Sequence, residues 1–438
     1  MGAEDELVDR AAPDPNADRD PTAARRGSAA LVSTPARVGW VVAAVALLFV
    51  LVRATVSMEG DVTRFIVAGD YTDPAAVPSE VHVFEGQGND GQFNYRYALD
   101  PTELGLGAHL GVSIDLPLRA GRIGYPALAW LASLGGRPEL VPYALVGVNV
   151  AALGLLGWMG ALLARRASRP PVVGILLPAW SGFLFTLARD YGDIVGAAAA
   201  VGAICLPPRK HPIAHGLLLG GAVITRELYL VVVAALVLER LVELWKGRRR
   251  RPVASDLAWV LPAAIFAVWQ WLASRQVGTF PITSGEGNRT FPFVGLLRAV
   301  RAWVTEILQR PDGWTEAAMA GLSLVQFLLL VVFSVTVGRA ILHSARRART
   351  RSARTTPVSR SDHLAPPAGV AGGWLLLALT LPLLSEDIWA AYNDFRNLSE
   401  FVVLGVVVLL SSREDLRPPT AALGASWWVT LVPRVVRV

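Results

Sequence analysis

Long apolar runs flanked by charged residues recur through most of this sequence, and they constrain its fold more than any other feature. Several runs have about 15 to 25 residues, close to the ~20 that an α-helix needs to cross a lipid bilayer. The composition agrees, with 53% hydrophobic residues, 17% charged residues and a mean hydropathy of +0.44. A β-barrel would show short alternating segments instead. The sequence therefore predicts an all-α, polytopic membrane protein with about ten to twelve transmembrane helices.

Basic residues gather at the ends of apolar runs, as in Arg165-Arg166, the run from Arg248 to Arg251, and Arg346-Arg347. Cytoplasmic loops of membrane proteins carry such an excess of arginine, which also contacts anionic lipid. We therefore interpret the net charge of +6 as a topology signal and expect no nucleic-acid partner. The single cysteine, Cys205, excludes an intrachain disulfide and a cysteine-cluster metal site.

The pattern divides the chain into three parts. Residues 1–36 predict a disordered cytoplasmic tail, residues 37–415 a polytopic membrane domain, and residues 416–438 an apolar segment that spans the membrane or lies at its interface. With the basic connections inside, the outer loops are 57–121, which we expect to carry interfacial helices, 189–193, 225–227, 275–313 and 385–397. The short run 122–136 is expected to be re-entrant or to lie along the outer surface, and residues 339–367 to form a cytoplasmic basic linker. The predicted spans are 38–56, 143–163, 172–187, 194–206, 213–225, 228–245, 257–273, 317–337, 372–384 and 398–410.

The polar stretch NDGQFNYRYALDP, residues 89–101, stands out in the first outer loop. From Gln92 onward its spacing fits a helix, with Gln92 and Arg96 on one face. One interpretation makes Asp90 the N-cap of that helix and Arg96 a surface charge, with Gly91 permitting a tight turn. The other makes Asp90 a catalytic carboxylate that accepts a proton from a sugar hydroxyl. The two interpretations are compatible.

A family resemblance follows from DGQFNYRYALDP, the later RIGYPALAW and the tripeptide TRE at residues 225–227. Together they resemble a group of actinobacterial multipass proteins similar to the GT-C superfamily of integral membrane glycosyltransferases. The resemblance covers most of residues 38–412 and implies that an acid in the first external loop, here Asp90, is the catalytic base or a metal-linked acid. It also implies a sugar donor carried on a polyprenyl phosphate. This chain has Asn94 where an aromatic residue is usual, and one acid rather than an adjacent pair. No cofactor is therefore expected with certainty, and a divalent metal is the alternative.

A lipid-borne donor needs fixed cations for its phosphate. Arginine suits this role because it makes paired, charge-assisted hydrogen bonds to phosphate oxygens. The candidates in the outer loops are Arg226, Arg289 and Arg396, and Glu227 is expected to orient Arg226. A structural ion pair between Arg226 and Glu227 is the alternative. Arg189, Asp190 and Asp193 form a second charged cluster at a helix junction, and simple topology flanks are the alternative interpretation. The residues expected to contact substrate are Gln92, Tyr95, Arg96, Glu227, Trp389 and Tyr392.

Other common signatures are absent from the sequence, including a Walker A loop, a dinucleotide fingerprint and HExxH. The pair His211 and His215 has helical spacing but no partnering acid, so we expect no metal there. The sequence therefore predicts an inverting glycosyltransferase in the bacterial cytoplasmic membrane. Its donor would be a polyprenyl-phosphate sugar and its acceptor an envelope glycan, lipid or protein on the outer face. A transporter or lipid-linked-sugar flippase is the main alternative, and a non-catalytic scaffold of envelope assembly is the second.

Overall fold

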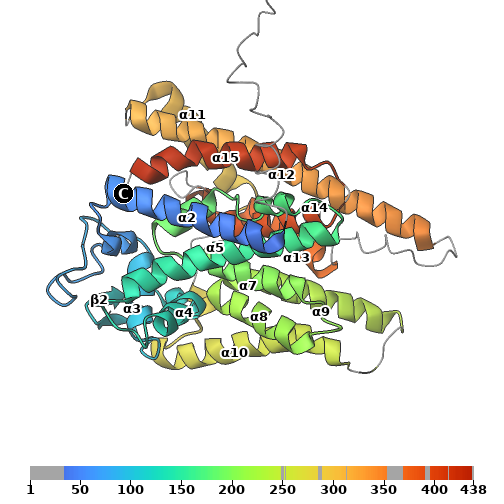
Figure 1. Cartoon of the computed structure of the whole chain (residues 1–438), viewed down its shortest axis with the longest axis horizontal. Helices are drawn as coiled ribbons and strands as arrows, with labels where there is room; N and C mark the ends of the chain where they lie inside the picture. Colours follow the sequence, from blue (N-terminus) through green and yellow to red (C-terminus); the bar gives the residue numbers. More distant parts are fainter. Residues whose placement is uncertain are drawn as a thin grey trace, which may run out of the picture.

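The computed structural model describes residues 34–247, 251, 253–284, 289–311, 313–352, 368–389, 395–412 and 414–436. This part of the chain is mostly helical, and its long helices run roughly along the longest axis of the molecule (Figure 1). Most of the predicted tail, residues 1–33, lies outside it. The first helix starts where Thr34 accepts a hydrogen bond from the Arg37 amide and Pro35 occupies the first turn, both common at helix N-termini.

The apolar runs form helices close to their predicted places. Packing partners among them include α2 with α5, α8 with both α7 and α10, and α13 with α9. The helices are α2 (Pro35–Ser57), α5 (Val141–Arg166), α7 (Asp193–Cys205), α8 (Pro212–Thr225), α9 (Leu230–Trp245), α10 (Leu257–Val277), α12 (Trp314–Ser352), α13 (Ala368–Thr380), α14 (Ser399–Leu410) and α15 (Arg417–Val436).

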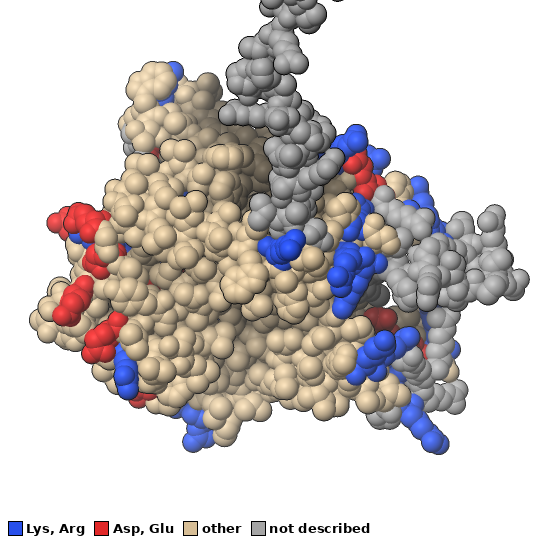
Figure 2. Space-filling view, viewed as in Figure 1, with Lys and Arg blue, Asp and Glu red and all other residues tan. Residues whose placement is uncertain are grey.

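Four helices in the described part of the chain are long and apolar enough to cross a membrane: Pro35–Ser57, Val141–Arg166, Ala254–Val277 and Trp314–Arg347. Three shorter apolar helices, Asp193–Cys205, Pro212–Thr225 and Gly369–Leu383, accompany them. Figure 2 shows mixed acidic and basic side chains at one end, mainly basic ones at the other, and a broad uncharged surface between. We call the end that carries residues 57–121 the polar end. The basic end carries Arg165, Arg166, Arg209 and Lys210.

Three sequence expectations need correction. The predicted span 172–187 is broken into a 3₁₀ segment, η3 (Pro171–Leu176), and a short helix, α6 (Gly182–Ala188), with Pro178 between them. The predicted linker 339–367 is helical as far as Ser352, because α12 continues well past its apolar part; residues 353–367 are not described. The outer loop 275–313 contains an amphipathic helix, α11 (Val294–Gln309), that lies against α12.

The first outer loop folds into small elements at the polar end. They are η1 (Val62–Ile66), α3 (Gly91–Leu99), an antiparallel pair of strands β1 (Gly107–His109) and β2 (Val112–Ile114), and η2 (Pro117–Gly121). The short run after the loop is a nine-residue helix, α4 (Gly124–Ala132), too short to span a bilayer. It packs against α3 and α5.

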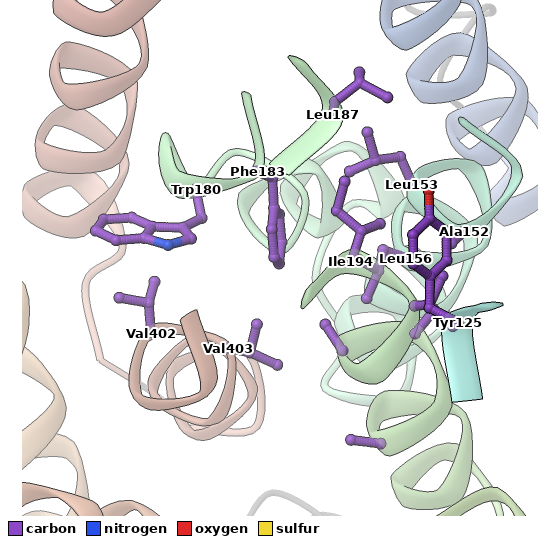
Figure 3. Close-up of a cluster of buried hydrophobic side chains, with 14 of the residues drawn as sticks. Tyr125, Ala152, Leu153, Leu156, Trp180, Phe183, Leu187, Ile194, Val402 and Val403 are labelled. Carbon is purple, nitrogen blue, oxygen red and sulfur yellow. The ribbon is translucent and has the colours of Figure 1, made fainter. Parts of the chain in front are cut away.

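A hydrophobic cluster joins the elements beneath the polar end (Figure 3). Tyr125 comes from α4, Leu153 and Leu156 from α5, Phe183 from α6 and Val403 from α14. All five side chains are buried. This packing holds the start of α14 beside α6 and α7, so charged residues at those helix ends meet at one place.

Candidate functional site

Asp90 stands immediately before the first turn of α3, as its N-cap position requires, but its side chain makes no capping hydrogen bond. The carboxylate is instead partly open, with 36% of the side chain exposed. Gly91 has helical geometry, and its role is close packing rather than a tight turn. A Cβ there would lie 2.4 Å from the Ile66 carbonyl oxygen and 2.7 Å from that of Arg189. Only glycine lets the start of α3 rest on the turn after α6.

Tyr191 connects Asp90 to Arg396. Its hydroxyl donates to Asn89 Oδ1 at 3.0 Å and accepts from the Asp90 backbone amide at 3.3 Å. The Arg396 guanidinium lies over the Tyr191 ring, 3.7 Å from its centroid, and its Nη2 is 3.9 Å from Asp90 Oδ2. Arg396 is buried, and its Nε and Nη1 find no hydrogen-bond partner among the described residues. A buried cation that is stacked on the Tyr191 ring thus faces the partly open carboxylate of Asp90.

A buried triad of charges lies beside this pair. Arg226 donates from Nε to Glu400 Oε1 at 2.8 Å and lies 3.2 Å from Asp193 Oδ1. Asp193 also accepts from the Thr186 hydroxyl at 3.3 Å and approaches Arg396 Nη1 to 3.8 Å. Asp193 and Glu400 each have only 1% of the side chain exposed. Both acids therefore neutralise the buried charge of Arg226. Arg226 is thus committed to these ion pairs and is not a cation free to bind phosphate.

Glu227 does not orient Arg226, contrary to the sequence expectation. It accepts two hydrogen bonds from Arg122, at 3.0 Å from Nε and 2.6 Å from Nη2. Burial alone would raise the pKa of Glu227, but the charge and hydrogen bonds of Arg122, with the charge of Arg226, lower it to about 2. This paired geometry holds Arg122, which begins the RIGYPALAW stretch, at the end of α8.

Asp190 is an acid whose pKa is shifted in the opposite direction from the pKa of Glu227. It is fully buried with a left-handed φ of 51°, and burial raises the pKa of its carboxyl well above the ordinary value. Its backbone carbonyl accepts from Asn94 Nδ2 at 2.8 Å. Asn149 of α5 donates to the Tyr125 hydroxyl and to the Tyr191 carbonyl, both at 3.0 Å. This network fixes α3, α4 and the turn after α6 on α5.

Several of these groups line a cavity with a volume of about 30 Å³. That volume holds about one or two water molecules. One face of α3 lines it, because residues three and four apart lie on the same side of a helix. The lining residues are Asp90, Phe93, Asn94, Tyr97, Arg119, Arg122, Tyr125, Tyr191, Gly192, Asp193, Thr225 and Arg226.

Three predicted substrate contacts are on the other side of α3. Gln92 is buried and accepts from the Gly69 amide and the Thr72 hydroxyl. Arg96 is buried and donates to the carbonyls of residues 105, 107 and 112, so it holds the β1–β2 hairpin in place. Tyr95 is 1% exposed. None of the three lines the cavity. We therefore assign them to the support of the loop and correct the expected sugar contacts.

The remaining predicted residues are separate from the cavity or undescribed. Arg289 is exposed and pairs through its backbone with Leu384, which leaves it outside the cavity lining. Trp389 is buried against Phe327 and Phe395, with ring centroids 6.0 and 6.3 Å away, so it packs in an aromatic cluster. Tyr392 lies outside the described residues.

A group of arginines adjoins the cavity around the Phe185 ring. The guanidinium carbons of Arg189, Arg396 and Arg434 lie 4.6, 5.8 and 4.7 Å from its centroid. Arg53 of α2 donates from Nη1 to the Arg434 carbonyl. All four arginines are buried. We call this set the arginine cluster; sequence reasoning had singled out Arg189 and Arg396 and missed Arg53 and Arg434.

In the described ranges, no three or more side chains of His, Cys, Asp or Glu lie together in a group that could hold a metal ion. At the cavity, Asp193 is paired with Arg226, and Asp90 faces Arg396. This donor set does not fit the divalent metal that the resemblance left as an alternative, because both acids face arginines.

Sequence reasoning missed Glu400, Tyr191, Arg122 and the cavity-facing role of Asn94. Glu400 had a usable signal, since it is an acid inside the apolar run LSEFVVLGVVVLL, and acids in such runs are costly unless paired. Arg122 and Tyr191 had no such signal. No family model matches this chain, and neither a curated protein nor a solved structure matches it.

Proposed function

We propose that this protein is a membrane glycosyltransferase that transfers a sugar from a polyprenyl-phosphate donor to an envelope glycan, lipid or protein acceptor. The observation that carries the proposal is the placement of Asp90. Its carboxylate neither caps its helix nor forms a close ion pair, and it opens into a cavity beside a buried arginine. A carboxylate in that position is suited to accept a proton.

Asp90 acts as the base in the proposed reaction. It removes the proton of the acceptor hydroxyl while the hydroxyl oxygen attacks the anomeric carbon. The bond from that carbon to the phosphate oxygen breaks, and the polyprenyl phosphate leaves with the bond's electron pair. Attack opposite to the leaving group inverts the anomeric configuration. The negative charge that develops on the phosphate needs fixed cations close by.

The arginine cluster is better placed for that phosphate than Arg226. Arg396 lies between the cluster and Asp90, which lines the cavity. Its Nη2 is 3.9 Å from Asp90 Oδ2, and its guanidinium carbon is 5.8 Å from the Phe185 centroid. Arg226 is held by two buried acids, one of which, Asp193, also approaches Arg396. Arg226 is thus a positioning residue in this proposal.

The orientation of the protein supports chemistry at a membrane surface. Positive charge gathers at the basic end, opposite the polar end, as expected for a cytoplasmic face. The polar end then faces outward, where nucleotide sugars are absent and a lipid-borne donor is required. The cavity of about 30 Å³ holds water only. The lining side chains must therefore move apart when a sugar binds.

The test is transfer of radiolabelled sugar from a panel of polyprenyl-phosphate sugars by purified wild type and Asp90→Asn. The substitution keeps the size of the side chain and removes the base. Asp70→Asn is the matched control, because Asp70 is an exposed acid of the same loop and does not line the cavity. We expect a loss of at least about 100-fold for Asp90→Asn and none for the control.

Equal activity in wild type and Asp90→Asn would remove Asp90 from the mechanism. Absence of transfer by folded wild type across the whole panel favours the transporter or flippase. Movement of a fluorescent lipid-linked sugar between vesicle leaflets would then test that alternative directly.

A further inference from the structure

A second cavity lies at the basic end, far along the helices from Asp90. Its volume is about 300 Å³, and it opens between the end of α5, the α7–α8 turn, α9 and the start of α13. Its walls are mostly apolar, with Leu163, Ile204, Val232, Leu236 and Val370 among them. Among the described residues that line it, those with charged or hydrogen-bonding side chains are Arg166, His215 and Ser411.

His215 lines this cavity and holds an unused acceptor just behind its wall. The residue is 5% exposed, and its Nδ1 lies 2.9 Å from the Leu206 carbonyl oxygen. A carbonyl only accepts, so the proton is on Nδ1 and Nε2 of the neutral ring carries a lone pair. That nitrogen is buried without a hydrogen-bond partner among the described residues. Leaving such an atom unsatisfied is costly, which points to a donor from a bound molecule.

Arg166 adds a positive charge to the same cavity. Its Nη1 donates to the Cys205 carbonyl at 2.9 Å, which draws the guanidinium across the end of α7, while the residue as a whole is exposed. Other basic side chains, Arg165, Arg209 and Lys210, belong to the neighbouring helix ends. An occupant therefore meets apolar walls, one acceptor in the interior and a cation at the rim.

We propose that this cavity binds an anionic phospholipid whose headgroup carries a hydroxyl, as phosphatidylglycerol does. The acyl chain lies against the apolar walls, and the phosphate contacts Arg166. The headgroup hydroxyl donates to His215 Nε2 when the side chains that cover this nitrogen move aside. A lipid is favoured over a soluble anion because the cavity adjoins α8 and α9, whose outer faces expose Ile213, Leu217, Leu238 and Leu241. The basic surroundings favour a lipid with a negative headgroup.

The experiment is native mass spectrometry of the full chain in detergent with three lipids of equal chain length. Phosphatidylglycerol has the charge and the hydroxyls, phosphatidylmethanol has the charge alone, and phosphatidylcholine has no net charge. We expect retention in that order, with phosphatidylglycerol about tenfold above phosphatidylcholine. Equal retention of the three lipids overturns the proposal.

Two variants separate the contributions of the two side chains. Arg166→Gln lowers retention of both anionic lipids severalfold, whereas Arg165→Gln, on the adjacent exposed residue outside the cavity lining, leaves it unchanged. His215→Leu removes the preference for phosphatidylglycerol over phosphatidylmethanol and keeps the preference for both over phosphatidylcholine. Identical losses in Arg166→Gln and Arg165→Gln would show that charge at this end acts without a defined site. This proposal does not depend on glycosyl transfer. The outcome of the lipid-retention experiment and the outcome of the sugar-transfer test are independent of each other.

Discussion

Arg226 and Glu400 are 174 residues apart in sequence and meet in the interior through a hydrogen bond of 2.8 Å. The bond joins the end of α8 to the first turn of α14, and Asp193 at the start of α7 completes the triad. Three helix ends are thereby held at one point beneath the candidate site. Removing one partner of a buried ion pair leaves a charge that neither water nor protein compensates.

Arg226→Gln should therefore destabilise the protein more than Glu400→Gln. The first change leaves two buried acids without their cation, while the second leaves Arg226 paired with Asp193. We expect losses of about 3–5 kcal/mol in the free energy of unfolding for Arg226→Gln and smaller losses for Glu400→Gln. Thermal unfolding of each variant in nanodiscs measures the order of these stability losses. Arg298→Gln, on an exposed arginine of α11, is the control, and equal effects of Arg226→Gln and Arg298→Gln would contradict the triad.

Gly91→Ala should displace α3 from the turn after α6. The new Cβ would meet two backbone carbonyl oxygens, neither of which is a flexible side-chain end. We expect a loss of about 1–3 kcal/mol in stability and a fall in sugar transfer if Asp90 is the base. Gly147→Ala in α5 is the matched control, because a Cβ there meets nothing within 4 Å. A variant that unfolds and transfers like wild type would show that the contact is not required.

Asp190→Asn should stabilise the protein at neutral pH. Since burial raises the pKa of this carboxyl in the folded state, the folded protein holds a proton that the unfolded chain loses above about pH 3.8. The contribution of Asp190 to stability is thus full below that pH and declines as the pH rises. Asparagine is neutral at every pH and tolerates the left-handed φ of 51°.

The check on Asp190 is the pH dependence of unfolding from about pH 5 to 8. We expect the stability gain of Asp190→Asn over wild type to grow with pH. A gain that stays constant, or a loss that grows, would mean that Asp190 is charged in the folded protein.

Glu227→Gln should have the opposite pH dependence. The pKa of Glu227 is lowered to about 2 in the folded state, so its contribution is present above about pH 4.5 and disappears as the pH falls toward 2. Wild type should be more stable than Glu227→Gln by about 1–3 kcal/mol near pH 7. Urea unfolding at pH 7 and at about pH 3 should show that difference shrinking. A difference independent of pH would place the loss in packing rather than in the ion pair with Arg122.

The sequence predicted the larger elements well because long apolar helices have a strong signal. Runs such as 38–56 and 143–163 appear as α2 and α5, with ends shifted by only a few residues. The predicted span 172–187 is wrong, because Pro178 breaks the helix and tertiary contacts hold the two fragments. The helix α11 was missed because its apolar residues follow one face and never form a continuous run.

The candidate site was only partly predictable for a geometric reason. The helical spacing in DGQFNYRYALDP already places Gln92 and Arg96 on one face of the helix and Asp90, Asn94 and Tyr97 on another. Which face looks inward depends on the turn at 188–193, whose contact with Gly91 no local pattern reveals. The ion-pair partners of the charged residues could not be predicted from local sequence for the same reason. Glu227 lies next to Arg226 in sequence, yet its hydrogen bonds go to Arg122, 105 residues away.

The long separation of Arg226 and Glu400 also orders the assembly of the protein. In a chain inserted from its N-terminus, Asp193 and Arg226 enter with the middle helices and pair with each other alone. Glu400 and Arg396 arrive only with α14, so the charge balance of the interior and the cation that faces Asp90 are both completed late. A protein interrupted before α14 contains the proposed base without its facing arginine. The candidate site therefore comes into existence only when the last part of the chain has been built in.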